Sequence, residues 1–119
     1  MAANGSRFRL TKDDGTEVAS AVAVADGLWS RFVGLMGRPE LPAGEGLCIR
    51  PCSSIHMFFM RFPIDAVFVD RDGRVLRIYR ELRPWRITGI VRRAKAVLEL
   101  PAGSTAASGV DVGQTLTLS

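Results

Sequence analysis

The sequence from residue 64 to residue 82 reads IDAVFVDRDGRVLRIYREL. The run Ile64–Val69 is apolar apart from Asp65, as expected for a buried strand. Turn-forming residues follow at 70–73, and Val75–Leu82 then alternates between two faces, which is typical of a half-buried strand. This stretch predicts a central β-hairpin. In its second arm, one predicted face carries Leu76, Ile78 and Leu82, and the other carries Val75, Arg77, Tyr79 and Glu81.

Shorter β-prone runs lie on both sides of the hairpin, at residues 8–10, 18–24, 47–50, 96–100 and 115–118. One helix is expected within residues 26–37, where Leu28, Phe32 and Leu35 have helical spacing and Asp26 can cap the first turn. Six or seven short strands with one short α-helix predict a mainly β fold, a compact β-sandwich or a barrel-like domain. We expect the 119 residues to form a single domain, 1–119.

The composition is that of a globular protein, with 47% hydrophobic and 24% charged residues. No apolar run approaches the roughly 20 residues of a membrane helix, and the first ten residues lack the apolar core of a signal peptide. We therefore expect a cytoplasmic protein without membrane contact. In a reducing compartment, Cys48 and Cys52 are expected to stay unbridged.

Basic residues are concentrated in a strip from Arg71 to Lys95, which holds nine of them against Asp72 and Glu81, or about +7. Arginine recurs there every third residue, and Tyr79 and Trp85 could add a stacking surface for nucleic acid. On a regular strand, however, a three-residue repeat alternates faces. We interpret the row as a solvated edge that discourages aggregation, and keep binding of a polyanion or nucleic acid as an alternative.

Cys48, Cys52 and His56, with Met57 and Met60 nearby, form the only cluster of soft ligands in the sequence, and soft ligands suit zinc or copper. Within this cluster, Cys52 and His56 are the thiol and imidazole nearest to each other in sequence. In an extended segment their Cα atoms would lie about 13 Å apart, too far for chelation, whereas a helical turn would bring them together. They are therefore weak candidates for metal ligands, and the sequence leaves the cofactor unknown. A thiol-dependent enzyme is the second alternative, with Cys52 as nucleophile, His56 as base and Asp65 as the orienting group.

Two carboxylates interrupt apolar strands and need partners, because an unpaired buried charge costs several kcal/mol. Asp65 is expected to pair with Arg31 or Arg61 in a bridge that fixes the helix to the sheet, and a ligand-facing role is the alternative. Glu99 poses the same question on another strand. If the two carboxylates converged, they would form an acidic pocket or share a cation.

Several motifs in order resemble a family of uncharacterised bacterial and archaeal proteins, "domain of unknown function 192". They are GLMGR at 34–38 with Arg31 before it, PCSSIH at 51–56, MRFPIDAVFVD at 60–70 and VLELPAG at 97–103. The resemblance implies an all-β, sandwich-like fold with one helix, and it carries no established activity. The chain departs from many relatives at 59–62 and 113–114 and is similar to the cytosolic subgroup.

Together these features predict a non-enzymatic ligand-binding or accessory domain. Its candidate site contains Cys52, His56, Met60, Arg61 and Asp65, and Trp85 borders it. The expected partner is a small ligand or a peptide. Phe58, Phe59 and Phe62 exceed what one strand face can bury, so some of them are expected to line an apolar groove.

Overall fold

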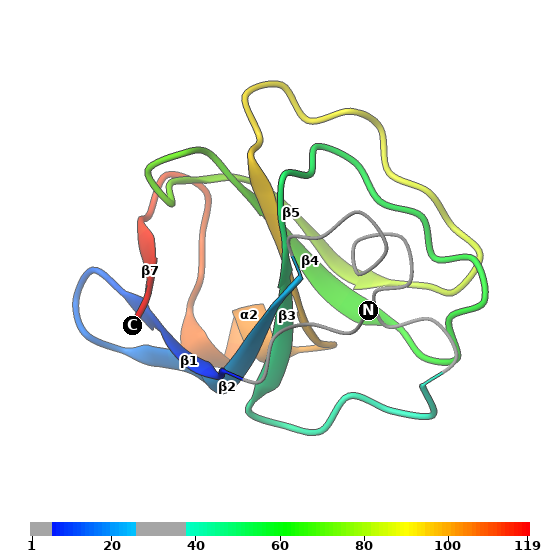
Figure 1. Ribbon diagram of the computed structural model, residues 1–119, viewed down its shortest axis with the longest axis horizontal. Coiled ribbons are helices and arrows are strands. Elements are labelled where there is room, and N and C mark those ends of the chain that lie inside the picture. Colours follow the sequence, from blue (N-terminus) through cyan, green and yellow to red (C-terminus); the bar gives the residue numbers. More distant parts are fainter. Residues whose placement is uncertain (1–5, 26–37) are drawn as a thin grey trace.

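The computed structural model describes residues 6–25 and 38–119. The helix predicted within 26–37 lies outside these residues. The described strands are β1 (Phe8–Lys12), β2 (Glu17–Ala25), β3 (Glu45–Ile49), β4 (Ile64–Val69), β5 (Val75–Leu82), β6 (Ala96–Pro101) and β7 (Leu116–Leu118), and the described helix is α2 (Ser104–Ser108) (Figure 1). Every strand predicted from the sequence is therefore present within a few residues of its expected bounds.

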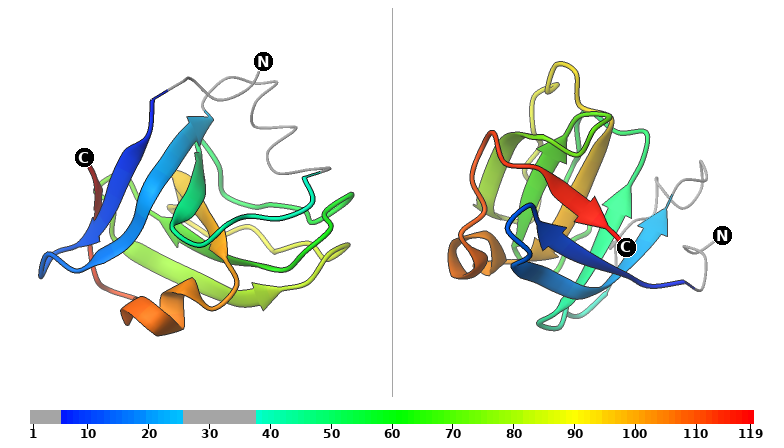
Figure 2. Two further views of the ribbon diagram at one scale, coloured as in Figure 1. Left: turned by 90° about the horizontal axis from the view of Figure 1, so that it is seen from below. Right: turned by 90° about the vertical axis from the view of Figure 1, so that its left-hand side faces the viewer.

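The strands form one seven-stranded sheet in the order β5-β4-β6-β3-β2-β1-β7. The pairing of β2 with β3 is parallel and the other pairings are antiparallel. The sheet curls into a half-barrel, so that the chain before β7 returns to the start of β5 (Figure 2). There the Val75 N–H donates to the carbonyl of Gln114 at 2.8 Å, and the Leu116 N–H donates to that of Gly73 at 2.9 Å. The predicted mainly β, barrel-like fold is confirmed.

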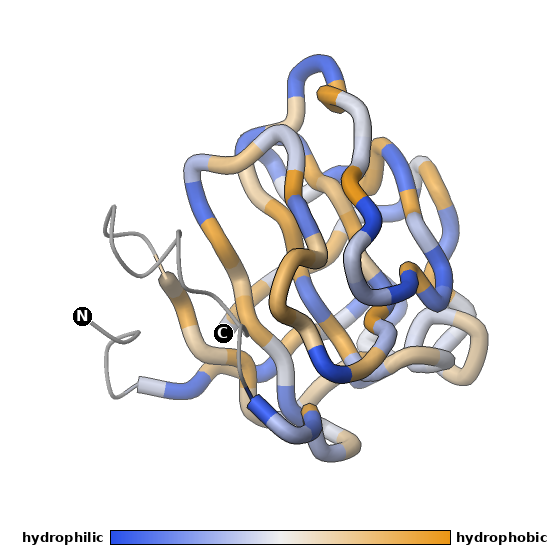
Figure 3. Tube along the Cα trace, turned by 90° about the vertical axis from the view of Figure 1, so that its right-hand side faces the viewer, coloured by the Kyte–Doolittle hydropathy of each residue, from blue (hydrophilic) through white to orange (hydrophobic). Residues whose placement is uncertain are grey.

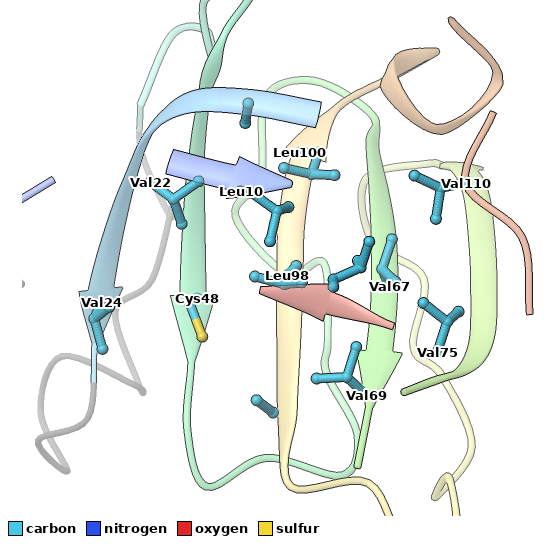
Figure 4. Close-up of a cluster of buried hydrophobic side chains, with 13 residues drawn as sticks. Leu10, Val22, Val24, Cys48, Val67, Val69, Val75, Leu98, Leu100 and Val110 are labelled. Carbon is cyan, nitrogen blue, oxygen red and sulfur yellow. The ribbon is translucent and has the colours of Figure 1, made fainter. Parts of the chain in front are cut away.

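Two apolar clusters pack on the two faces of the sheet. The inner cluster contains Leu10, Val22, Val24, Cys48, Val67, Val69, Val75, Leu98, Leu100 and Val110 (Figure 4). The outer cluster contains Leu47, Ile49, Met57, Met60, Ile64, Phe68 and Val97. All six residues of β4 are buried, because both of its faces are covered. The outer cover includes Met57 and Met60, which come from the loop between β3 and β4.

The predicted alternation along β5 is wrong in detail, because the pairing of β4 with β5 shifts register twice. One shift lies between the pairs of Ile64 and Ala66, and the other between those of Phe68 and Val69. A bulge adds a residue to one strand and so exchanges the faces of the side chains beyond it. As a result, Ile78 packs in the inner cluster, whereas Leu76, Tyr79 and Leu82 pack in the outer one.

Helix α2 was not predicted from the sequence. Its five residues, STAAS, are too few to show an apolar period. No helix in the described ranges is long and apolar enough to span a membrane.

Candidate functional site

Two long loops, 50–63 and 83–95, run side by side at one end of the molecule, at the right of Figure 1. Backbone hydrogen bonds join them: the Met57 N–H donates to the Arg86 carbonyl at 2.6 Å, and the Trp85 N–H donates to the Met57 carbonyl at 2.8 Å. Further along, the Thr88 N–H donates to the Ile55 carbonyl at 2.9 Å, and the Thr88 hydroxyl accepts from the Ile55 N–H at 3.0 Å. These backbone hydrogen bonds therefore hold residues 83–93 against the loop 50–63.

At one end of this series of hydrogen bonds, each loop makes a tight turn. Each turn places an aromatic residue in the left-handed region of backbone conformation, with positive φ. In the 57–60 turn, the Met60 N–H donates to the Met57 carbonyl and Phe59 has φ 65°. In the 83–86 turn, Pro84 precedes Trp85, which has φ 70°. This is the pattern of a type II turn, in which glycine or asparagine normally takes the third position. We call these two segments the paired turns.

The rings carried by the paired turns contact one another on the surface. The ring centroids of Phe59 and Trp85 lie 5.1 Å apart, and those of Phe58 and Trp85 lie 6.0 Å apart. The imidazole of His56 adds a fourth ring, 4.9 Å from that of Phe58. Phe59 and Trp85 are 61% and 60% exposed. The loops thus present a cluster of aromatic rings to solvent instead of burying it in the core.

Arginines line two shallow hollows that share Tyr79, one of which reaches the 83–86 turn. One hollow, of about 490 Å³, contains Arg77, Arg92 and Arg93 in its lining. The other, of about 470 Å³, contains Arg80, Arg83 and Arg86. The prediction that no single face collects the six arginines of the three-residue repeat agrees with this arrangement. Arg77 lies in one hollow and Arg80, Arg83 and Arg86 lie in the other, while Arg92 and Arg93 come from the loop after β5. Figure 3 views this side of the molecule, where strongly polar and apolar positions are interleaved along the chain.

Carboxylates neutralise little of this charge. All nine basic residues between Arg71 and Lys95 are exposed. Among the described residues, only Arg80 of the nine has a carboxylate within 4.0 Å, that of Asp111 at 3.4 Å. The guanidinium of Arg77 instead lies over the ring of Tyr79, 4.5 Å from its centroid.

The structure places Cys52 and His56, the predicted thiol and imidazole pair, in separate local hydrogen bonds. The Cys52 thiol donates to the Ser54 carbonyl at 3.1 Å. The Nδ1 atom of His56 accepts from the Phe58 N–H at 3.2 Å. Cys48 lies in the inner cluster, on the other face of the sheet. Within residues 6–25 and 38–119, no group of three or more His, Cys, Asp or Glu side chains is placed to hold a metal ion.

The other predicted site residues are spread over different environments. Met60 is buried in the outer cluster, whereas Arg61 is exposed beside the 57–60 turn. Trp85 stands at the centre of the aromatic cluster. His56, Arg61 and Trp85 therefore belong to the surface of the paired turns, and Met60 supports that surface from below.

Asp65 lies away from this surface, on the inner face of the sheet, and is fully buried. Its carboxylate accepts hydrogen bonds from the N–H groups of Glu81, Gly103 and Thr105, and from the Thr105 hydroxyl at 2.6 Å. The predicted arginine partner is wrong for Arg61, and Arg31 is outside the described residues. Backbone amides at the start of α2 and at the β5 bulge stabilise the charge instead. Asp65 thus joins three distant segments.

Glu99 does not converge with Asp65. The carboxylate projects to the outer face, since Glu99 pairs with Ala66 while Asp65 pairs with Leu100. Glu99 is 5% exposed, and within the described part of the chain its side chain has no hydrogen-bond donor. Burial raises the pKa of this carboxyl from 4.5 to about 8.

Sequence reasoning missed two features of this surface. Arg92 and Arg93 were counted as charges but not placed opposite Arg77, because loop conformation is not encoded in a local pattern. The tight turns were also missed. The pair Pro84-Trp85 was the available signal for one of them, since proline favours the second position of such a turn.

By its fold and its candidate site, this chain is a small, mainly β protein with a curled sheet and an exposed aromatic and basic surface. The family model "Uncharacterized ACR", domain of unknown function 192, matches residues 9–118. The chain belongs to this family. It is 35% identical over 112 residues to a UPF0127 protein of Pyrococcus furiosus, covering 90% of this chain and 94% of that protein. It is 39% identical over 85 residues to a UPF0127 protein of Pyrococcus horikoshii, covering 69% and 73%.

Two crystal structures are similar to this fold. One is a protein of unknown function from Novosphingobium aromaticivorans, with a TM-score of 0.81 and 26% identity, covering 93% of this chain and 83% of that one. The other is described as a "putative transcription regulator" from Sinorhizobium meliloti, with a TM-score of 0.83 and 26% identity, covering 99% and 96%. The UPF0127 names state no activity, so the function has to be argued from the residues of this chain.

Proposed function

We propose that this protein is a non-enzymatic binding domain whose ligand docks on the paired turns. The observation that carries the proposal is the conformation of Phe59 and Trp85, two large exposed side chains held at φ 65° and 70°. A bulky residue in the left-handed region costs about 1–2 kcal/mol, and such strain gathers at functional sites. Glycine would remove that strain, so the rings themselves are the feature that the turns preserve.

The surroundings of the rings support recognition through stacking and charge. His56, Phe58 and Trp85 form a continuous series of ring contacts, and Arg83 and Arg86 flank the same turn. A ligand with a flat or apolar group and a negative charge would complement both features. The thiol of Cys52 and Nδ1 of His56 are each held in a local hydrogen bond, which favours a binding role for this segment over a thiol and imidazole mechanism.

Titration of ¹⁵N-labelled protein tests the proposal. The probes are thymidine monophosphate, a short peptide of tryptophan and glycine, and inorganic phosphate. We expect both ring-bearing probes to shift the amide signals of residues 57–60 and 83–86 and the indole signal of Trp85. Phosphate alone should shift the arginine signals without moving those of the rings.

The Trp85→Ala variant should lose the response of Phe58 and Phe59 to the ring-bearing probes. Val112→Ala is the matched control, because Val112 is also a large exposed apolar residue, 61% accessible, but lies outside both loops. Signals of the paired turns that stay unchanged with millimolar ring-bearing probes would contradict the proposal. So would an equal loss of binding in the two variants.

A further inference from the structure

We infer that the ligand of the paired turns is a single-stranded nucleic acid, whose bases stack on the exposed rings and whose phosphates lie along the two arginine hollows. This inference rests on the proposed function and names its ligand. It joins two observations that are independent of each other: the strained aromatic turns, and the arginines of the two hollows, of which only Arg80 has a carboxylate within 4.0 Å among the described residues although Glu81 also lines the second hollow.

The charge points to a polyanion. Eight of the nine basic residues between Arg71 and Lys95 have no carboxylate within 4.0 Å among the described residues, and all nine are exposed. Solubility alone does not require that six of these arginines line two adjoining hollows. Arginine groups placed in this way suit successive phosphates of one backbone, because each guanidinium can bind a phosphate with two parallel hydrogen bonds.

The exposed rings point to the bases of a single strand. Exposed aromatic side chains next to a basic groove are the common feature of sites for single-stranded nucleic acid, since every base has a flat face that can stack. In a duplex these faces are covered by neighbouring base pairs. Stacking on Phe59 and Trp85 therefore requires unpaired bases, which a single strand offers.

The arrangement along the surface also matches such a strand. Tyr79 belongs to both hollows, and its ring supports the guanidinium of Arg77. The second hollow contains Arg83 and Arg86, the two ends of the turn that carries Trp85. The two hollows therefore lead from β5 to the turn that carries Trp85, so that one backbone bound along them reaches the exposed rings. An acidic peptide would satisfy the arginines but would leave the rings without flat partners.

Fluorescence anisotropy with end-labelled probes tests the inference. The probes are oligothymidylate and oligouridylate of about twelve nucleotides, an abasic oligomer with the same number of phosphates, and an oligoglutamate peptide of the same length. We expect both oligonucleotides to bind more tightly than the abasic oligomer and the peptide. Comparison of the first two distinguishes DNA from RNA. The logarithm of the affinity should fall linearly with the logarithm of the salt concentration.

Variants separate stacking from charge. Trp85→Ala should weaken oligonucleotide binding by roughly 5- to 150-fold, the range for loss of one stacked base, and should leave abasic binding unchanged. Trp85→Phe should restore most of the affinity. The pair Arg83→Gln and Arg86→Gln should weaken both ligands and reduce the salt slope by about 1.4. The pair Arg7→Gln and Arg9→Gln is the matched control, since it removes the same charge from β1 and from the residue just before it, and β1 lies away from the two loops (Figure 1).

Equal affinity for the abasic oligomer and the oligonucleotide would overturn the inference, as would equal affinity for oligoglutamate. Either result leaves the proposed function standing if ring-bearing monomers still bind at the paired turns. If oligonucleotides bind but Trp85→Ala and Val112→Ala bind alike, both claims fail, because binding does not involve the turns. Equal losses in the two arginine pairs would show general charge attraction and would also overturn the inference.

Discussion

Replacing Glu99 by glutamine should change how the stability of this protein depends on pH. Glu99 is 5% exposed on the outer face of β6, and burial raises the pKa of its carboxyl to about 8 in the folded state. In the unfolded chain the same carboxyl has its ordinary pKa of 4.5. Between these two values the folded state binds more protons than the unfolded state, so the free energy of unfolding falls as the pH rises. Glutamine has no proton to lose and should abolish this contribution.

The magnitude follows from the gap between the two pKa values. One pKa unit corresponds to about 1.36 kcal/mol, so Glu99 should lower the free energy of unfolding by roughly 4 kcal/mol between pH 5 and pH 8. The total approaches roughly 5 kcal/mol above pH 8 and vanishes below pH 4.5. This is a large part of the 5–15 kcal/mol that stabilises a typical domain.

Urea denaturation of the wild type and Glu99→Gln at pH 5, 6, 7, 8 and 9 measures the effect. The difference between the two unfolding free energies should grow steadily in favour of the variant up to about pH 8. Glu17→Gln is the matched control, because the side chain of Glu17 is 50% exposed in an ion pair with Arg9. Its pH profile should run parallel to that of the wild type. A profile of Glu99→Gln that also runs parallel to the wild type, within about 1 kcal/mol, would refute the argument from burial.

Three other substitutions test single contacts by thermal or urea unfolding. Asp65→Asn should lower the free energy of unfolding by roughly 2–4 kcal/mol, because it removes the charge that four hydrogen-bond donors stabilise. The exposed control Asp111→Asn should lower it by less than about 1 kcal/mol. Equal losses would contradict the role given to Asp65. Gly73→Ala should lose about 2–4 kcal/mol, since its φ is 85° and a methyl group would collide with the Leu116 carbonyl. Gly15→Ala, with φ 89° and open space, should lose only about 1 kcal/mol, and a similar loss at both glycines would argue against the closure of the half-barrel. Phe59→Gly should change stability by less than about 1 kcal/mol, as relief of strain offsets the lost ring contacts, and should weaken ligand binding; a loss of 3 kcal/mol or more would show that the ring is structural.

Sequence patterns predicted the strands and the class of fold well. Ile64–Val69 and Val75–Leu82 were recognisable because alternation and turn residues are local properties of the chain. The faces of β5 were not, because bulges depend on how two strands pair and leave no local signal. Helix α2 was missed because its five residues owe their stability to the sheet and to Asp65.

The candidate site was only partly predictable for the same reason. His56, Arg61 and Trp85 were chosen for their chemistry and lie at the paired turns, whereas Asp65 was chosen for its burial and lies on the opposite face. The sequence by itself determined that a buried carboxylate on β4 needs a partner, since desolvation of a charge follows from its apolar neighbours. Only the tertiary structure decided that the partner is a helix start some 40 residues away, and that two separate turns bring their rings together. Contacts between distant segments depend on chain topology, and that information is not contained in any local pattern.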